Sequence, residues 1–302
     1  MCGVCSGRVA YELSEKVVLV IDGGLAGDRA LEWTLARAAH IELDVRLTAI
    51  DDSGSLHSQP EKRLRTVRAL SRAAAQFAQS SSQSKVEIVL LRGGAVDQLA
   101  RESERADIVV LGSASVSALR GIFNASIPLG FAPRSSCPVV IVPTDWVASS
   151  GPVVVGIDEP TSHTAHEFAA REAERLDREL VLVRAWELPP MVTTEVLGAG
   201  SVEETIRDAN AELLATAAFE IERRHGSLAM KEKLSFTTPS RALAAGGEGT
   251  QLVVIGTHHR RTLAEWMLGS VGHDLLMHLS CPVAIVPPVV SPTDPIGARR
   301  RG

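Results

Sequence analysis

The chain has 302 residues, of which 45% are hydrophobic and 22% are charged, and its formal net charge at pH 7 is -5. This length suits two domains of ordinary size, and this composition is that of a soluble globular protein. The acidic balance argues against a general nucleic-acid-binding protein, which normally presents a basic face. No apolar run reaches the roughly 18 residues of a membrane helix, and the N-terminus lacks the apolar core of a signal peptide. We therefore expect a cytoplasmic protein with no nucleic-acid or membrane partner.

The four cysteines are too few for a disulfide scaffold in a chain of this length. Cys137 and Cys281 stand in matched Ser-Cys-Pro-Val contexts before apolar runs, and we expect both to behave as small buried hydrophobic side chains. Cys2 and Cys5 form an isolated C-x-x-C without the further ligands that zinc requires. Two interpretations of this last pair stay open, a redox pair and a disordered N-terminus.

In chain order, the first half alternates apolar runs with amphipathic stretches. Residues 17–22 form a continuous apolar run that ends in Asp22 and two glycines, as expected of a strand buried on both faces. Further strands are expected at 43–50, 86–91, 107–111 and 138–142, and helices at 28–41, 61–79, 96–104 and from Ser126 onward. Five strands that alternate with helices predict an α/β domain with a parallel sheet.

The same pattern restarts at residue 152. Strands are expected at 152–157, 179–186, 231–236, 252–255 and 282–286, and helices at 164–177, 202–225, 239–243 and from Ser270 onward. Asp22 and Asp158 are 136 residues apart, whereas the pairs Gly112/Gly256, Ser126/Ser270 and Cys137/Cys281 are all 144 residues apart. We therefore predict two related domains, 1–148 and 149–290, and a disordered tail at 291–302.

One stretch of the second half, residues 251–271, carries most of the functional signal. It predicts a buried strand, a loop framed by Gly256 and Gly269, and a helix that opens with Ser270 and Val271. In an open parallel sheet, ligands bind beyond the carboxyl ends of the strands, where the strand order reverses. If strands one and four are neighbours there, an acidic residue faces a helix start whose backbone N–H groups can bind an anion. That arrangement suits a nucleotide, although the spacing alone leaves a plain turn and helix N-cap equally open.

The pattern G-x2-G-x9-G-[S/T], with an apolar strand before it and C-P-V-x-[IV]-V-P after it, resembles that of the universal stress protein family. A first strand that reads V-x-V-G-x-D is also similar to that family. The resemblance covers each half once, so the chain is identified as a tandem member of actinobacterial type. It implies two five-stranded Rossmann-like domains, of the adenine nucleotide alpha hydrolase-like kind, that pair through their last strands as a pseudo-dimer or in a homodimer. Many members of the family bind ATP, and others do not.

In the second half, the resemblance implies a set of nucleotide-binding residues, which are Asp158, Ala185, Gly256, His259, Gly269, Ser270 and Val271. Asp158 corresponds to the acidic residue on the adenine side, and Ala185 to the position whose backbone contacts adenine. His259 stands where the family has its second glycine, so an imidazole must fit near the phosphates. The remaining two glycine positions and the hydroxyl residue are kept.

In the first half, the same resemblance implies a weaker set, which is Asp22, Ile50, Gly112, Ser115 and Ser126. Here Ser115 replaces the second glycine and Ala125 replaces the third, where a close approach to phosphate is needed. Pro128 also removes one backbone N–H from the start of the helix. The second half is therefore the better candidate for a nucleotide site.

We expect a stress-response regulatory protein that binds ATP, with or without Mg²⁺, in its second half and has no dedicated catalysis. The chain has no G-x4-G-K-[ST] phosphate loop and no H-E-x-x-H, so any ATP hydrolysis would be slow and incidental. We interpret His258, His259, His273 and His278 as surface or loop side chains and expect no metal site. One alternative is an interaction scaffold that binds no nucleotide and recruits regulatory protein partners. A weaker alternative is an enzyme related to adenylating proteins or electron-transfer flavoproteins.

Overall fold

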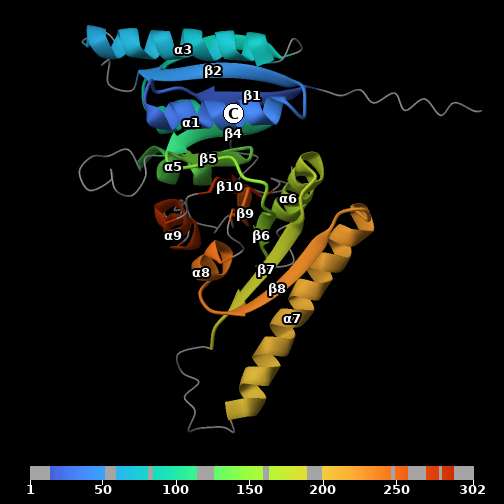
Figure 1. Cartoon of the computed structure of the whole chain (residues 1–302). Helices are drawn as coiled ribbons and strands as arrows, with labels where there is room; N and C mark the ends of the chain where they lie inside the picture. The colour runs from blue at the N-terminus through green and yellow to red at the C-terminus, as the bar shows by residue number, and fades with distance from the viewer. Residues whose placement is uncertain are drawn as a thin grey trace, which may run out of the picture.

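The computed structural model describes residues 14–51, 59–80, 84–113, 126–158, 163–188, 199–245, 249–257, 270–278 and 281–288. Figure 1 shows one continuous sheet that runs from the first half of the chain, through β5 and β10, to β8 at the far side. Cys2, Cys5 and the predicted tail at 291–302 lie outside the described residues. Among the helices of the described part, none is long and apolar enough to cross a membrane.

The two halves contain the same kinds of element in the same order. The first half consists of β1 (Glu15–Val20), α1 (Leu25–Ala38), β2 (Leu43–Asp51), α3 (Pro60–Ser80), β3 (Lys85–Arg92), α4 (Ala95–Ser103), β4 (Ile108–Ser113), α5 (Ser126–Phe131), the 3₁₀ turn η1 (Ala132–Arg134) and β5 (Val139–Pro143). The second half consists of β6 (Val153–Gly156), α6 (His163–Leu176), β7 (Leu180–Trp186), α7 (Ala199–Arg224), β8 (Met230–Phe236), α8 (Pro239–Ala244), β9 (Leu252–Gly256), α9 (Ser270–His278) and β10 (Val283–Val286). The expected α/β alternation is confirmed in both halves.

The sheet has the strand order β3-β2-β1-β4-β5-β10-β9-β6-β7-β8. All strand pairs within each half are parallel, as the unbroken apolar runs predict. The halves meet where β5 and β10 pair antiparallel, with Val140 opposite Ala284. The chain is therefore an intramolecular pseudo-dimer joined through its last strands, which confirms the expectation drawn from the family resemblance.

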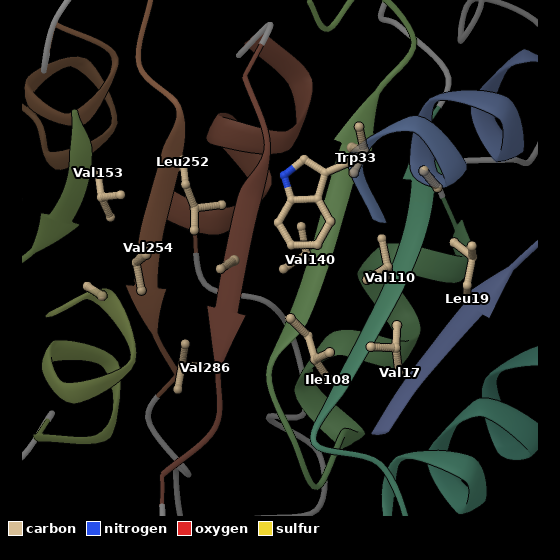
Figure 2. Packing of buried hydrophobic residues seen from close by; sticks show 14 of the residues in the cluster. Val17, Leu19, Trp33, Ile108, Val110, Val140, Val153, Leu252, Val254 and Val286 are labelled. Carbon is tan, nitrogen blue, oxygen red and sulfur yellow. The ribbon is translucent and has the colours of Figure 1, made fainter. Parts of the chain in front are cut away.

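Two hydrophobic cores cover the two faces of this sheet, and each core contains residues of both halves. One core packs beneath α1, α3, α6 and α7, and the other packs beneath the side that carries α4, α5, α8 and α9. Figure 2 shows the first core, where the Trp33 indole of α1 lies beside Val140 of β5. Because Trp33 is 5% exposed at the join between the halves, its burial stabilises their pairing as well as the first half itself.

The first helix differs from its sequence-based bounds. A helix was expected at 28–41, but α1 begins at Leu25 and ends at Ala38, so the expected range was wrong by three residues at each end. The physical reason at the start is Asp22, whose carboxylate accepts the backbone N–H groups of Gly24 and Gly27 and allows the helix to begin directly after the glycines.

The two cysteines within the described residues are free thiols next to the second core. Burial raises the pKa of Cys137 to about 12 and the pKa of Cys281 to about 11, so both thiols stay protonated at neutral pH. Cys137 is buried and Cys281 is partly buried. Both fit the expected role as small hydrophobic side chains.

Candidate functional site

Each half has one point where the strand order reverses, between β1 and β4 in the first half and between β6 and β9 in the second. Asp22 follows the end of β1 by two residues, and Asp158 follows the end of β6 by two residues. Gly112 and Gly256 lie at the carboxyl ends of the neighbouring strands β4 and β9. The acidic residue and the first glycine of each motif are therefore brought to the same edge of the sheet, where parallel sheets bind ligands.

The hydrogen bonds of the sheet confirm that Ile50 and Ala185 are equivalent positions. The Ile21 N–H donates to the Thr48 carbonyl at 2.8 Å, and in the second half the Ile157 N–H donates to the Val183 carbonyl at 2.8 Å. Ile50 and Ala185 each follow these carbonyls by two residues. Both side chains pack against the second core, at the carboxyl ends of β2 and β7.

In the first half, Asp22 serves the fold. Its Oδ1 accepts the Gly24 N–H at 2.8 Å and the Gly27 N–H at 3.2 Å, so the carboxylate organises the start of α1. Gly23 has φ +77°, a backbone conformation that favours glycine, and makes the turn before the helix. Asp22 remains exposed, and these two hydrogen bonds use one of its two carboxylate oxygens.

Gly112 has a structural explanation of its own. A Cβ atom on this glycine would lie 2.0 Å from the Ala26 carbonyl oxygen, because the first turn of α1 packs directly on the end of β4. The glycine therefore permits close packing of a helix on a strand. The identity of this motif position in the first half needs no nucleotide to explain it.

In the second half, Asp158 has a different partner. Arg184 Nη1 donates to Asp158 Oδ1 at 3.0 Å and also to the backbone carbonyls of Asp158, at 2.7 Å, and Ile157, at 3.0 Å. Arg184 Nε donates to Asn210 Oδ1 of α7 at 2.8 Å, which fixes the guanidinium. The Asp158 side chain is still 63% exposed. In the first half, the position equivalent to Arg184 is Ala49, so this arrangement belongs to the second half, and the motif gives no sign of it.

Helix α9, described from Ser270 to His278, follows β9 in the chain. Ser270 is exposed, and Val271 packs against the second core. Ser240 Oγ of α8 donates to Asp274 Oδ2 at 2.8 Å and ties the two helices together. The first backbone N–H groups of α9 therefore lie on a helix that is tied to α8, and they can donate hydrogen bonds to an anion.

Several expected site residues lie outside the described residues. These are Ser115, His259 and Gly269. In the first half, Ser126 is the first described residue of helix α5. Among the histidines interpreted as surface residues, His273 is exposed, and the described part of the chain holds no group of three or more potential metal ligands.

A small cavity lies behind Asp158, between the end of β6 and the helices α6 and α7. It is lined by Ile157, Asp158, His166, Leu213, Thr216, Ala217 and Glu220, and its volume of about 20 Å³ suits one water molecule. His166 is 4% exposed, its Nε2 has no hydrogen-bond partner, and burial lowers the pKa of the imidazole to about 4. Sequence reasoning missed His166 because it is a single histidine on an amphipathic helix, with no motif around it.

Comparison with known proteins identifies one family whose sequence model matches both halves of the chain. The model of the universal stress protein family matches residues 14–143 and again residues 150–287. Universal stress protein Rv2005c of Mycobacterium tuberculosis is 26% identical over 287 residues, which cover 89% of this chain and 96% of that protein. A universal stress protein of Mycolicibacterium smegmatis is 28% identical over 194 residues, which cover 62% of this chain and 63% of that protein.

Solved structures share the fold across the whole tandem. The crystal structure of a universal stress protein from Archaeoglobus fulgidus superposes with a TM-score of 0.67 and 16% identity, covering 91% of this chain and 98% of that one. A putative universal stress protein of Pseudomonas aeruginosa superposes with a TM-score of 0.61 and 17% identity, covering 92% of this chain and 94% of that one. At sequence identities this low, the similarity shows a shared fold and nothing more.

Proposed function

Because the chain belongs to the universal stress protein family, we propose that it is a regulatory protein that binds ATP at the β6–β9 edge of its second half. The observation that carries the proposal is the pairing of an exposed Asp158, held by Arg184, with the glycine end of β9 at one strand-order reversal. The first half uses its equivalent residue, Asp22, to organise α1. The contact of Arg184 with Asp158 has no counterpart in the first half, where the equivalent position is Ala49, and this difference favours one nucleotide site over two.

The residues present fit an adenine nucleotide. The Asp158 carboxylate can accept hydrogen bonds from the nucleoside, and the backbone of Ala185 lies at the same edge of the sheet. The N–H groups at the start of α9 suit a phosphate, because they lack partners within the helix and lie at the positive end of its dipole. Mg²⁺, when bound, would be held mainly by the phosphates of the nucleotide, since the described residues offer no cluster of metal ligands.

The proposed role is binding without dedicated catalysis. Hydrolysis of ATP would require a positioned base or a metal-binding carboxylate set near the phosphates. The carboxylate at this edge, Asp158, is paired with Arg184, which suits recognition more than proton transfer. Occupancy by nucleotide would then act by favouring one conformation or one set of partners.

Calorimetry with Mg-ATP on the purified full chain, combined with mass spectrometry of copurified small molecules, tests the proposal. We expect one ATP per chain. Asp158→Ala should weaken ATP binding about tenfold, because a hydrogen-bond acceptor for the ligand is lost. Asp22→Ala is the matched control, and it should leave ATP binding unchanged while lowering stability by about 1 kcal/mol, as loss of a helix cap does.

The contrary result is no heat at millimolar ATP and no copurified nucleotide. That outcome would favour the second candidate function, an interaction scaffold without a nucleotide. The packing of Gly112 against Ala26 and the engagement of Asp22 by α1 already favour this role for the first half. Equal loss of ATP binding in Asp22→Ala and Asp158→Ala would instead contradict the assignment to the second half.

A further inference from the structure

The outer edge of the first half presents four exposed apolar side chains, which we call the β3-edge patch. They are Leu64 and Val67 of α3, each 50% exposed, and Ile88 (51%) and Leu90 (47%) of β3. Among the described residues β3 is the last strand on this side, so within that part of the chain its outer backbone groups have no neighbouring strand.

The two pairs of side chains lie on the same face of the sheet. Ile88 is opposite Leu47 and Leu90 is opposite Ala49, and both of these β2 residues are buried in the core beneath α3. On α3, Val67 lies about 100° around the helix from the buried Thr66. Arg72, on the other flank, pairs with Asp28 of α1. Val67 is therefore turned away from α1, toward the open edge of the sheet, and Leu64, about 160° from Thr66, faces solvent beside it.

The equivalent edge in the second half is protected. There Glu232 of β8 is opposite Leu182, as Ile88 is opposite Leu47, and Glu232 is exposed. Leu234, the equivalent of Leu90, packs against the core. Phe236 at the end of β8 is exposed but stacks on Trp186, with ring centroids 4.6 Å apart. A charge on the edge strand is a common device against unwanted strand pairing, and the first half lacks it at this position.

The charge around the β3-edge patch indicates what chemistry would fit it. Helix α3 carries five basic residues and one acidic residue, although the whole chain has a net charge of -5. Arg63, Arg65 and Arg68 are exposed on this helix. By contrast α7, the equivalent helix of the second half, carries six acidic and three basic residues. An apolar edge bordered by arginines suits an apolar strand that carries acidic residues.

We propose that the β3-edge patch docks an extended acidic segment of a partner protein, which adds a strand beside β3. Backbone hydrogen bonds to the open edge would supply affinity, and alternate apolar side chains would cover Ile88 and Leu90. The arginines of α3 would attract the acidic residues and speed encounter. This surface is remote in topology from the β6–β9 edge, so the inference does not depend on nucleotide binding.

A labelled synthetic peptide of eight alternating valine and glutamate residues is a direct probe. Fluorescence anisotropy should show that it binds the full-length chain and that 0.5 M salt weakens binding, because salt screens exposed charges. Ile88→Glu gives the first half the charge that Glu232 provides in the second, and it should weaken binding about tenfold or more. Phe219→Glu is the matched control, since Phe219 is a 66% exposed side chain on α7, and it should change nothing.

Other outcomes would overturn the proposal. Equal binding of a valine–lysine peptide would show that charge plays no part in recognition. No binding of the acidic peptide at 1 mM would show that the β3-edge patch is not a docking site. If phosphatidylserine vesicles bind the chain through Ile88 while the peptide does not, the patch is a membrane surface. If sedimentation shows self-association that Ile88→Glu abolishes, the occupant is a second copy. Circular dichroism of each variant confirms that the chain remains folded.

Discussion

The acidic residue that follows the first strand has a different partner in each half of this molecule. Asp22 accepts two backbone N–H groups at the start of α1, whereas Asp158 receives the guanidinium of Arg184. The two halves share one strand order and both acidic residues are exposed, yet Asp22 contacts the start of a helix and Asp158 contacts an arginine of the neighbouring strand. A motif residue can thus be kept for folding alone, and its partners decide which role it has.

A second difference between the halves lies where they meet. Helices α1 and α6 have the same length, so Arg37 corresponds to Arg175 and Thr34 to Glu172. Thr34 donates to a carbonyl of its own helix, but Glu172 accepts from Arg37 across the join at 2.5 and 2.8 Å and from Arg175 at 2.7 Å. Glu15 of β1 completes the cluster, at 2.6 Å from Arg37. The second half therefore supplies a carboxylate at the helix position where the first half has Thr34.

This cluster is buried and fully paired. The side chains of Arg37 and Glu172 are 3% and 1% exposed. Burial opposes the charge on Arg37, but the adjacent carboxylates of Glu172 and Glu15 outweigh it and raise the pKa of Arg37. Arg37 also stacks on Trp33, with its guanidinium carbon 5.4 Å from the ring centroid. Removal of one partner would leave an uncompensated charge in the interior.

The largest effect is expected from Glu172→Ala, which breaks the asymmetry between α1 and α6. We expect it to lower the free energy of unfolding by about 3 kcal/mol, because a buried Arg37 loses its main partner. Urea denaturation measures this. Arg171→Ala is the control: the Arg171 side chain is 66% exposed in its pair with Glu167, and its loss should cost less than about 1 kcal/mol. Equal small losses for both variants would mean that the sheet and cores alone hold the halves together.

A smaller effect is expected from Gly112→Ala, which tests whether the motif glycine of the first half is needed for packing. The added methyl group would collide with the Ala26 carbonyl, so we expect a loss of about 2 kcal/mol in thermal denaturation. Gly130→Ala within α5 is the control, because its Cβ would meet Val96 at an ordinary 3.4 Å. That change should be neutral or slightly stabilising. A harmless Gly112→Ala would contradict the packing explanation.

The fold could be predicted from the sequence because its signals are local and repeated. Apolar runs marked the strands, and the recurrence of Asp22 as Asp158 and of Cys137 as Cys281 marked two copies of one domain. The pairing of β5 with β10 followed from the family resemblance. The edge of the sheet where Asp158 and Gly256 meet was also predictable, because parallel strands of this order bring those ends together.

The partners of these residues could not be predicted. Arg184 reaches Asp158 from 26 residues away, and Glu172 reaches Arg37 from 135 residues away, through packing that no local pattern encodes. His166 carries no motif, so its burial with an unpaired Nε2 emerges only from the arrangement of α6 and α7. Sequence signals indicate which elements form, whereas tertiary packing decides which side chains of those elements meet.

The smallest expected effect concerns how each half joins its two helices on the same face of the sheet. In the first half, Arg72 of α3 pairs with Asp28 of α1. In the second half, His225, which directly follows α7, lies between two carboxylates of α6, with Nε2 at 3.2 Å from Glu167 and Nδ1 at 2.9 Å from Glu174. Arg224 is also near Glu167, at 3.6 Å. The second half therefore joins these helices through an imidazole, whose charge depends on pH, where the first half uses a guanidinium.

Burial alone would lower the pKa of His225, but its hydrogen bonds to Glu174 and Glu167 outweigh this and raise the pKa above the ordinary 6.5. The stability that His225 contributes is therefore fully present below pH 6.5 and is lost as the pH rises through the raised pKa. Burial would raise the pKa of Glu167, but the hydrogen bond to His225 and the charge of Arg171 lower it below 4.5. The contribution of Glu167 is present above pH 4.5 and is lost in stronger acid.

His225→Gln should accordingly lower the free energy of unfolding by about 1 kcal/mol at pH 6 and by clearly less at pH 9. Arg72→Gln, its counterpart in the first half, should cost a small amount that is the same at both pH values, because arginine stays protonated throughout. Urea denaturation of both variants and the parent chain at the two pH values makes the comparison. A pH-independent loss in His225→Gln would show that the imidazole acts through packing, and the two halves would then join their helices in the same way.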